Sequence, residues 1–166
     1  RAEAEGLKPA EAIMNIKPKA APEAVNSINY RFINRWSMTQ EVFMERPDPN
    51  MQVSSSDMNT WERIEVGFGP QEKLDNIEGY AIYRTTFELD GKEAEKEQML
   101  FFYEIMGIIE VYINGEKAVE RDCAWGNSVE VPLKKGLSGN VTVSVLIKSG
   151  VRPRAGICKS VILKNK

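Results

Sequence analysis

Apolar residues at every second position dominate this sequence from residue 80 onward. Four segments show this alternation, with apolar side chains on one face of an extended chain and polar ones on the other: 83–89, 109–113, 129–133 and 141–147. A period of two is typical of strands that bury one face. No segment after residue 28 sustains a helical period. The pattern therefore predicts an all-β protein.

Turn-forming residues separate these segments. Asn114-Gly115 follows a β-branched segment and favours a two-residue hairpin, because both residues accept a positive φ. Asp90-Gly91 ends the segment that begins near Tyr80, and a polar, glycine-containing connection spans 134–140. Roughly nine to eleven short strands then fit into the chain after residue 28, which favours an antiparallel, two-sheet β-sandwich.

The parity of each segment predicts which side chains fill the core. Shifting a strand by one residue would turn its apolar side chains to solvent, so the buried set is well specified. We expect a core that contains Phe87, Leu89, Val111, Ile113, Val129, Val131, Val143 and Val145.

The beginning of the sequence differs from the remainder. Residues 1–22 hold Pro9, Pro18 and Pro22, together with alternating charges and few large apolar side chains. This composition predicts a linker or an N-terminal arm. Residues 23–166 then form a single domain, which suits a chain of 166 residues.

Composition excludes several classes of function. The chain has no histidine, so Ser-His-Asp triads, Cys-His nucleophiles and histidine-ligated zinc are absent from it. With 22 basic and 24 acidic residues, the net charge of −2 gives no footprint for nucleic acid. No run reaches the ~18 apolar residues of a membrane span. Cys123 and Cys158 lack metal-site spacing, and two free thiols are favoured over a disulfide.

Six segments occur in an order that resembles a known domain. They are 61–66 (WERIEV), 79–89 (GYAIYRTTFEL), 110–116 (EVYINGE), 129–136 (VEVPLKKG), 141–148, and the final pair 155–157 and 161–163. Over about residues 36–163, this series resembles the jelly-roll, galactose-binding-like domain of glycoside hydrolase family 2, the β-galactosidase and β-glucuronidase group. Ile82, Thr85 and Arg154 stand where that pattern has other residue types.

The resemblance implies a galactose-binding-like jelly roll in an extracellular or periplasmic protein. It also implies a non-catalytic role, because the (β/α)₈ barrel that carries both catalytic carboxylates in that family needs ~250 residues. We expect a carbohydrate-binding or accessory module of a polysaccharide-processing protein, whose partner is a glycan or a neighbouring catalytic domain. The alternative is a structural or protein-interaction sandwich without a small-molecule site.

A ligand site is predicted at one end of the sandwich, where loops vary without disturbing the core. Trp125 would stack on a sugar ring, because the C–H faces of pyranoses pack on indole rings. Asn127 and Asn76 would hydrogen-bond hydroxyls, and Arg154 would donate a bidentate pair. Tyr80 completes the set, since it adjoins a loop that approaches the active site in enzymes of the resembled family.

Two of these residues have a second interpretation. Trp125 lies in the polar stretch 122–127 between two predicted strands, where it would instead close one end of the sandwich. Arg152 and Arg154 flank a proline, and they would bind hydroxyls, carboxylates or sulfates together or remain solvated surface charges.

Other aromatic and basic side chains have structural roles. Trp36 and Trp61 are expected near the core or the sheet edge, and Tyr83 is expected to pack beside the core. Arg84 falls on the opposite face, where an ion pair with a neighbouring strand is the favoured role.

Neither a catalytic pair nor a cofactor is predicted. Glycosidases need two carboxylates about 5–10 Å apart. Glu104 and Glu110 lie on either side of a predicted turn at Gly107, but a chain with 24 acidic residues brings some together by chance. No metal site is assigned, and a structural calcium ion is left open by four hard-oxygen side chains without regular calcium spacing, Asp48, Asn50, Asp57 and Asp75.

Overall fold

A computed structural model of the chain describes residues 30–52 and 61–166. The predicted arm, residues 1–22, lies outside these ranges. The described part contains β1 (Tyr30–Phe32), β2 (Arg35–Thr39), β3 (Trp61–Glu65), the 3₁₀ turn η2 (Glu72–Leu74), β4 (Gly79–Leu89), the single-turn helix α2 (Gly91–Ala94), β5 (Gln98–Ile113), β6 (Glu116–Pro132), β7 (Gly139–Ser149), β8 (Gly156–Ile157) and β9 (Val161–Asn165).

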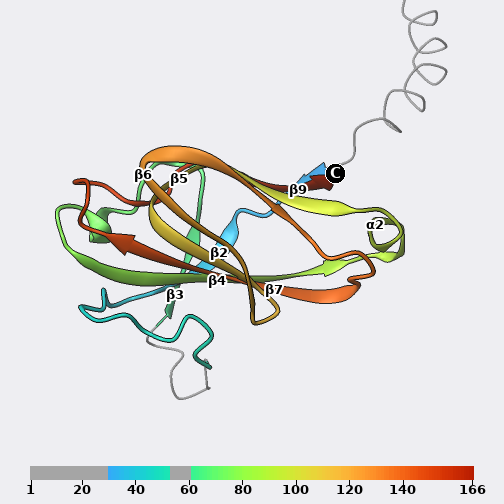
Figure 1. The fold of residues 1–166 in the computed structure, drawn as a ribbon, viewed down its shortest axis with the longest axis horizontal. Coiled ribbons are helices and arrows are strands. Elements are labelled where there is room, and N and C mark those ends of the chain that lie inside the picture. Colours follow the sequence, from blue (N-terminus) through green and yellow to red (C-terminus); the bar gives the residue numbers. More distant parts are fainter. Residues whose placement is uncertain (1–29, 53–60) are drawn as a thin grey trace, which may run out of the picture. The chain divides into compact units, whose positions relative to one another are not determined.

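The strands confirm the predicted all-β, antiparallel fold. Their order is β1-β9-β5-β7-β4-β2-β3, with β6 and β8 also paired to β5 (Figure 1). The hairpin prediction is confirmed as well, because Asn114 (φ 49°) and Gly115 (φ 88°) form the two-residue turn between β5 and β6. Ile113 and Glu116 are register partners across this turn.

All nine strands in the described residues belong to one continuous sheet, and the long strand β5 connects the two layers into which this sheet curls. Residues 98–102 pair with β9, whereas residues 108–113 pair with β7. Gly107 lies between these stretches with φ 125°. A Cβ atom there would lie 2.7 Å from Cγ2 of Ile147 and 2.9 Å from the carbonyl oxygen of Lys148, so glycine permits the bend and the close approach of β7. The expected turn at Gly107 was wrong, since the residue bends a continuous strand.

The core between the layers follows the predicted parity. Of the eight residues expected there, seven are buried, and Ile113 is half-buried against their cluster. Tyr83 is also fully buried, as expected, and its hydroxyl donates a 2.6 Å hydrogen bond to Oε1 of Gln71. The same oxygen accepts the N–H of Ile157 at 2.9 Å. The half-buried side-chain amide of Gln71 thus links β4 to β8.

A second apolar cluster lies on the outer face of β4 and β7. Trp61, Ile82 and Leu146 form it, and the partly buried Tyr80 and Met51 pack against it. Segment 40–52 crosses this face, and several hydrogen bonds hold it there, from Phe43 to Tyr80, from Arg46 to Glu110 and from Asn50 to Gly115. Apolar residues therefore occur on both faces of these two strands.

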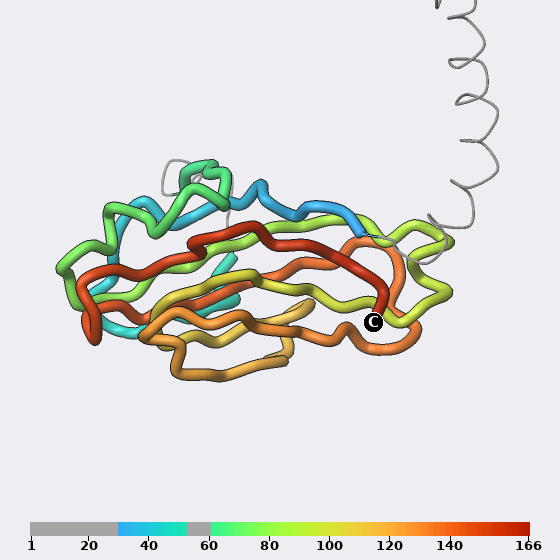
Figure 2. The backbone as a smooth tube through the Cα atoms, turned by 90° about the horizontal axis from the view of Figure 1, so that it is seen from above, coloured from blue at the N-terminus to red at the C-terminus, as the bar shows by residue number. Residues whose placement is uncertain are grey.

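The connections gather at the two ends of the molecule. Residues 66–78 and 150–155 lie together at one end, whereas α2 and the 133–138 turn lie at the other, as the views in Figures 1 and 2 agree. A hydrogen bond of 2.7 Å from the backbone N–H of Asn76 to the carbonyl oxygen of Pro153 joins the first two loops. Within 30–52 and 61–166, no helix is long and apolar enough to cross a lipid bilayer.

Candidate functional site

Trp125 is the most exposed tryptophan of the chain and lies on β6. The predicted loop between two strands was wrong, because β6 runs without a break from Glu116 to Pro132. Gly126 has φ 88°, and the β5–β6 register is irregular here, with Ile105 opposite Asn127 and Gly107 opposite Cys123. This bulge leaves the Trp125 side chain 74% exposed. An indole so exposed closes no part of the core.

Arg152 covers one face of this indole. Its Cζ atom lies 3.4 Å from the ring centroid of Trp125, within the distance at which a guanidinium stacks on a tryptophan. Arg152 belongs to the 150–155 loop and makes no hydrogen bond or ion pair with the residues that the structure describes. Stacking therefore orients both side chains while the donors of the guanidinium stay available.

Arg154 and Asn76 lie at the same end as Trp125. Arg154 and Arg152 border a small depression with Ala124, the residue before Trp125. Asn76 is exposed at a positive φ of 53°, and its backbone hydrogen bond to Pro153 places it beside the arginine loop. The structure thus brings together Trp125, Arg152, Arg154 and the backbone of Asn76.

Of the other two predicted residues, Asn127 lies near Trp125 and Tyr80 does not. Asn127 is exposed on β6, two positions beyond Trp125. Tyr80 packs instead on the outer face of β4 against the Trp61 cluster, and the Lys148 ammonium lies 5.9 Å from its ring centroid. No described contact joins Tyr80 to Trp125.

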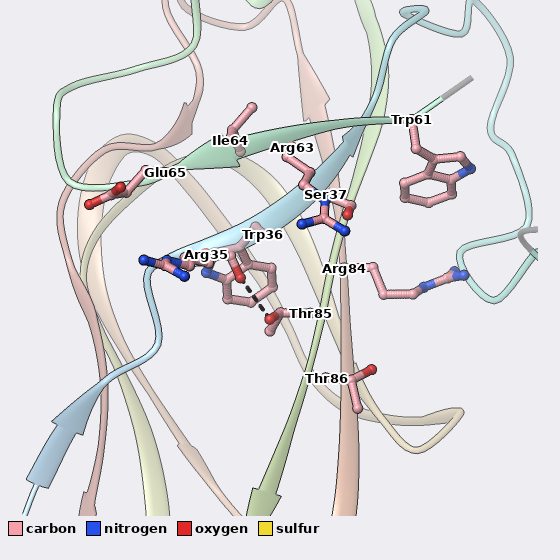
Figure 3. Close-up of a pocket in the computed structure, with 10 residues that line it drawn as sticks. All are labelled: Arg35, Trp36, Ser37, Trp61, Arg63, Ile64, Glu65, Arg84, Thr85 and Thr86. Carbon is pink, nitrogen blue, oxygen red and sulfur yellow. Dashed lines mark hydrogen bonds between the residues drawn. The ribbon is translucent and has the colours of Figure 1, made fainter. Parts of the chain in front are cut away.

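A larger hollow lies elsewhere, on the outer face of β2, β3 and β4. It has a volume of about 740 Å³, and its lining includes Arg35, Arg63 and Arg84 (Figure 3). The predicted site contains none of these arginines, and Arg84 was assigned a structural role. A usable signal was present, because alternation places Arg35 and Ser37 on the same face of one strand, as it does Arg63 and Glu65 on the next. Trp36 and Trp61, which also border the hollow, are buried as expected.

Arg84 does not form the expected ion pair. Its guanidinium donates to the carbonyl oxygens of Pro49 and Met51, each at 2.7 Å, and to the Ser144 hydroxyl at 2.8 Å. The Trp61 ring centroid lies 5.0 Å from its Cζ atom. Burial lowers the pKa of Arg84, which nevertheless stays charged because its ordinary value is so high. The residue anchors segment 40–52 rather than a neighbouring strand.

Of the two acidic residues weighed as a catalytic pair, Glu110 has structural partners. Glu110 accepts 2.7 and 2.5 Å hydrogen bonds from Arg46 and Tyr112 on the outer face. Partial burial alone would raise the pKa of Glu110, but these hydrogen bonds outweigh it and hold the pKa below its ordinary value. A glutamate held as a carboxylate in this way is a poor general acid.

Of the oxygen side chains considered for calcium, Asp48 and Asn50 share a local turn, whereas Asp75 lies elsewhere. Asp48 accepts the N–H of Asn50 at 2.9 Å in a local turn, and Asp75 follows η2. Asp57 lies outside the described residues. Within those ranges, no three acidic or cysteine side chains are grouped to hold a metal ion. Cys123 and Cys158 are both buried and free, as favoured from the sequence.

Comparison with solved structures identifies the fold. β-Glucuronidase 2 from Bacteroides uniformis, in a calcium-binding mutant, matches 82% of this chain at a TM-score of 0.66 and 19% identity. β-Glucuronidase from Faecalibacterium prausnitzii matches 84% at 0.65 and 12% identity. A family 2 β-galacturonidase from Eisenbergiella tayi matches 83% at 0.58 and 14% identity.

These matches cover only part of the larger chains. The chain spans 18%, 31% and 24% of the three proteins, respectively. Models of protein families and curated protein sequences give no match. The chain therefore has the fold of a single β-sandwich domain within these enzymes, as the resemblance implied.

Proposed function

We propose that this chain is a non-catalytic accessory domain of a glycoside-hydrolase-type, polysaccharide-processing protein, and that its Trp125 end binds carbohydrate. One observation carries the first part: the chain matches β-glucuronidases over more than four-fifths of its own length but less than a third of theirs. The absence of histidine and of a ~250-residue barrel supports a role without catalysis in this chain. An extracellular or periplasmic setting follows from polysaccharide as the substrate of the whole protein.

The Trp125 end has the chemistry that a sugar requires. A pyranose presents an apolar C–H face, which packs on an exposed aromatic ring, and hydroxyls, which need donors and acceptors around it. Arg152 covers one face of the indole, so a sugar would stack on the other face or displace the guanidinium. Arg154, Asn76 and Asn127 would then supply hydrogen bonds to hydroxyls.

A second function is favoured by the apolar side chains at this end. Val151 and Phe68 are exposed together with Trp125, and both belong to the loops that gather there. Exposed apolar groups in one region are typical of surfaces that another protein covers. The alternative is therefore a structural module that docks on a neighbouring domain through the same end and binds no glycan.

A binding experiment separates the two functions. Trp36 and Trp61 are buried, so intrinsic fluorescence of the purified chain reports mainly on Trp125 when a glycan is added. We expect weak binding to one or more members of a polysaccharide and oligosaccharide panel, near the millimolar range where the binding free energy is about −4 kcal/mol. Trp125→Ala should abolish this binding and leave the melting temperature within a few degrees.

Phe68→Ala is the matched control. Phe68 is even more exposed than Trp125, at 83% against 74%, so both variants remove an exposed aromatic ring. Retained binding in Phe68→Ala and lost binding in Trp125→Ala would support the sugar site. If the wild-type chain binds no glycan in the panel, the carbohydrate function is wrong and the docking function replaces it.

A further inference from the structure

The hollow on the outer face of β2, β3 and β4 results from strand divergence. β2 and β4 are register partners only at Ser37–Arg84 and Met38–Tyr83. Beyond these pairs the strands separate, and the indole of Trp36 lies in the opening between them (Figure 3). A hydrogen bond of 2.8 Å from Thr85 to the Arg35 carbonyl oxygen spans the gap. Its volume of about 740 Å³ falls in the range of small-molecule sites.

Two arginines at this hollow have no partner in the described residues. Arg35 and Arg63 are exposed, and neither guanidinium makes a hydrogen bond or ion pair within 30–52 and 61–166. Glu65 is the register partner of Arg35, yet the two form no salt bridge. In Figure 3 the Arg63 side chain extends from β3 toward Ser37 on β2. Guanidiniums whose N–H donors are free can bind a carboxylate or a sulfate through paired hydrogen bonds.

Arg84 adds positive charge without competing for a ligand. Its guanidinium points away from Trp36 and Arg63, toward the carbonyl oxygens of segment 40–52 (Figure 3). Three arginines and one glutamate border the hollow, so its net formal charge is +2 in a chain whose total is −2. A positive region bounded by low-dielectric walls attracts anions more strongly than a dispersed charge does.

We infer that this hollow is a second binding site, distinct from the Trp125 end, for an acidic saccharide whose carboxylate or sulfate pairs with Arg63 and Arg35. The hydroxyls of Ser37 and Thr86, which also border the hollow, would bind sugar hydroxyls. The acidic group distinguishes this ligand from a neutral glycan. The saccharide part of the inference rests on the proposed function, whereas the anion part rests on the arginines alone.

The test is a titration followed by nuclear magnetic resonance. Arginine Nε–Hε signals of the ¹⁵N-labelled full chain are recorded while D-glucuronate, D-glucose or sodium sulfate is added at constant ionic strength. We expect glucuronate to shift the Arg63 and Arg35 signals saturably, and glucose to leave them unchanged. Arg63→Gln should weaken the glucuronate affinity at least about tenfold, because a charge-assisted bidentate contact is lost.

Two control variants make the result specific. Arg121→Gln removes another exposed arginine, on β6, and should leave glucuronate binding unchanged. Trp125→Ala should also retain it, since the two sites are separate. The inference is overturned if glucose shifts the same signals equally, if Arg121→Gln weakens binding as much as Arg63→Gln, or if no saturable shift occurs. Sulfate binding as tight as glucuronate binding would overturn the saccharide assignment and leave a simple oxyanion site.

The outcomes separate this inference from the proposed function. Neutral-glycan binding that depends on Trp125, with no glucuronate effect on Arg63, would refute the second site and leave the proposed function intact. Glucuronate binding at Arg63 with no glycan binding at Trp125 would refute the sugar site at Trp125 and leave the second site intact.

Discussion

The guanidinium of Arg152 lies on the indole of Trp125, with 3.4 Å between Cζ and the ring centroid. The two residues come from the 150–155 loop and from β6, so their contact fixes a loop against a strand at the candidate ligand end. It also explains how an indole that is 74% exposed keeps one orientation. An oriented aromatic ring loses less conformational entropy when a ligand stacks on it.

Arg152→Ala should leave the fold intact and weaken glycan binding at Trp125. A cation–π contact at an exposed position contributes about 0.5–1 kcal/mol, so the melting temperature should change by only a few degrees. Acrylamide quenching of tryptophan fluorescence should increase, since the covered face of Trp125 becomes accessible to this uncharged quencher. Unchanged quenching would show that Arg152 does not cover the ring in solution.

Gly107→Ala should destabilise the domain by about 2–4 kcal/mol. The new Cβ atom would meet Ile147 and the Lys148 carbonyl at less than 3.0 Å, on a backbone with φ 125°. Gly91→Ala is the matched control, because a Cβ atom at Gly91 meets nothing within 4 Å. Urea denaturation measures both variants, and equal stabilities would contradict the bend at Gly107.

Glu110→Gln should reduce the dependence of stability on pH in the acid range. The folded-state pKa of Glu110 lies below its ordinary value of 4.5, because its hydrogen bonds to Arg46 and Tyr112 outweigh the opposing effect of burial. Its contribution to stability is therefore present above pH 4.5 and is lost as the pH falls through the lower folded-state pKa. Thermal denaturation from about pH 6 to about pH 3 should show a smaller loss for Glu110→Gln than for wild type.

Glu130→Gln provides the control for this pH series. Glu130 is an exposed glutamate that forms no ion pair within residues 30–52 and 61–166, so its variant should follow the wild-type pH curve. A Glu110→Gln curve that also follows wild type would mean that the cluster contributes nothing to acid stability.

Both thiols should resist Ellman's reagent in the folded protein. Burial raises the pKa of Cys158 to about 12, and the pKa of Cys123 is raised by the same cause. At about pH 8, almost no reactive thiolate is then present at Cys158. We expect two thiols to react in denaturant without a reducing agent, and neither to react rapidly in buffer. No reaction in denaturant would indicate a disulfide, contrary to the structure.

Much of the fold was predictable because it follows local rules. Alternation located the later strands and most of the core, and Asn114-Gly115 located the β5–β6 hairpin. The bend in β5 was not predictable, since Gly107 resembles a turn glycine until Ile147 is known to pack against it. The continuity of β6 through Trp125 was not predictable either, because Gly126 forms a bulge within the strand rather than a loop.

The candidate site was predictable in part. Aromatic and basic residues within polar stretches predicted Trp125 and Arg154 as site residues, and both lie at one end of the molecule. The stacking of Arg152 on Trp125 required a tertiary contact that no sequence spacing encodes. The hollow beside Arg63 depends on how far β2 and β4 diverge, which alternation does not determine.

The division of β5 between two layers also sets the order in which the chain can fold during synthesis on the ribosome. The β5–β6 hairpin is local and can close early, whereas the partners Gln98 and Asn165 are 67 residues apart. Until β9 has been made, the first half of β5 therefore has an open edge of unpaired backbone groups and apolar side chains. Such an edge is a template for pairing with other chains.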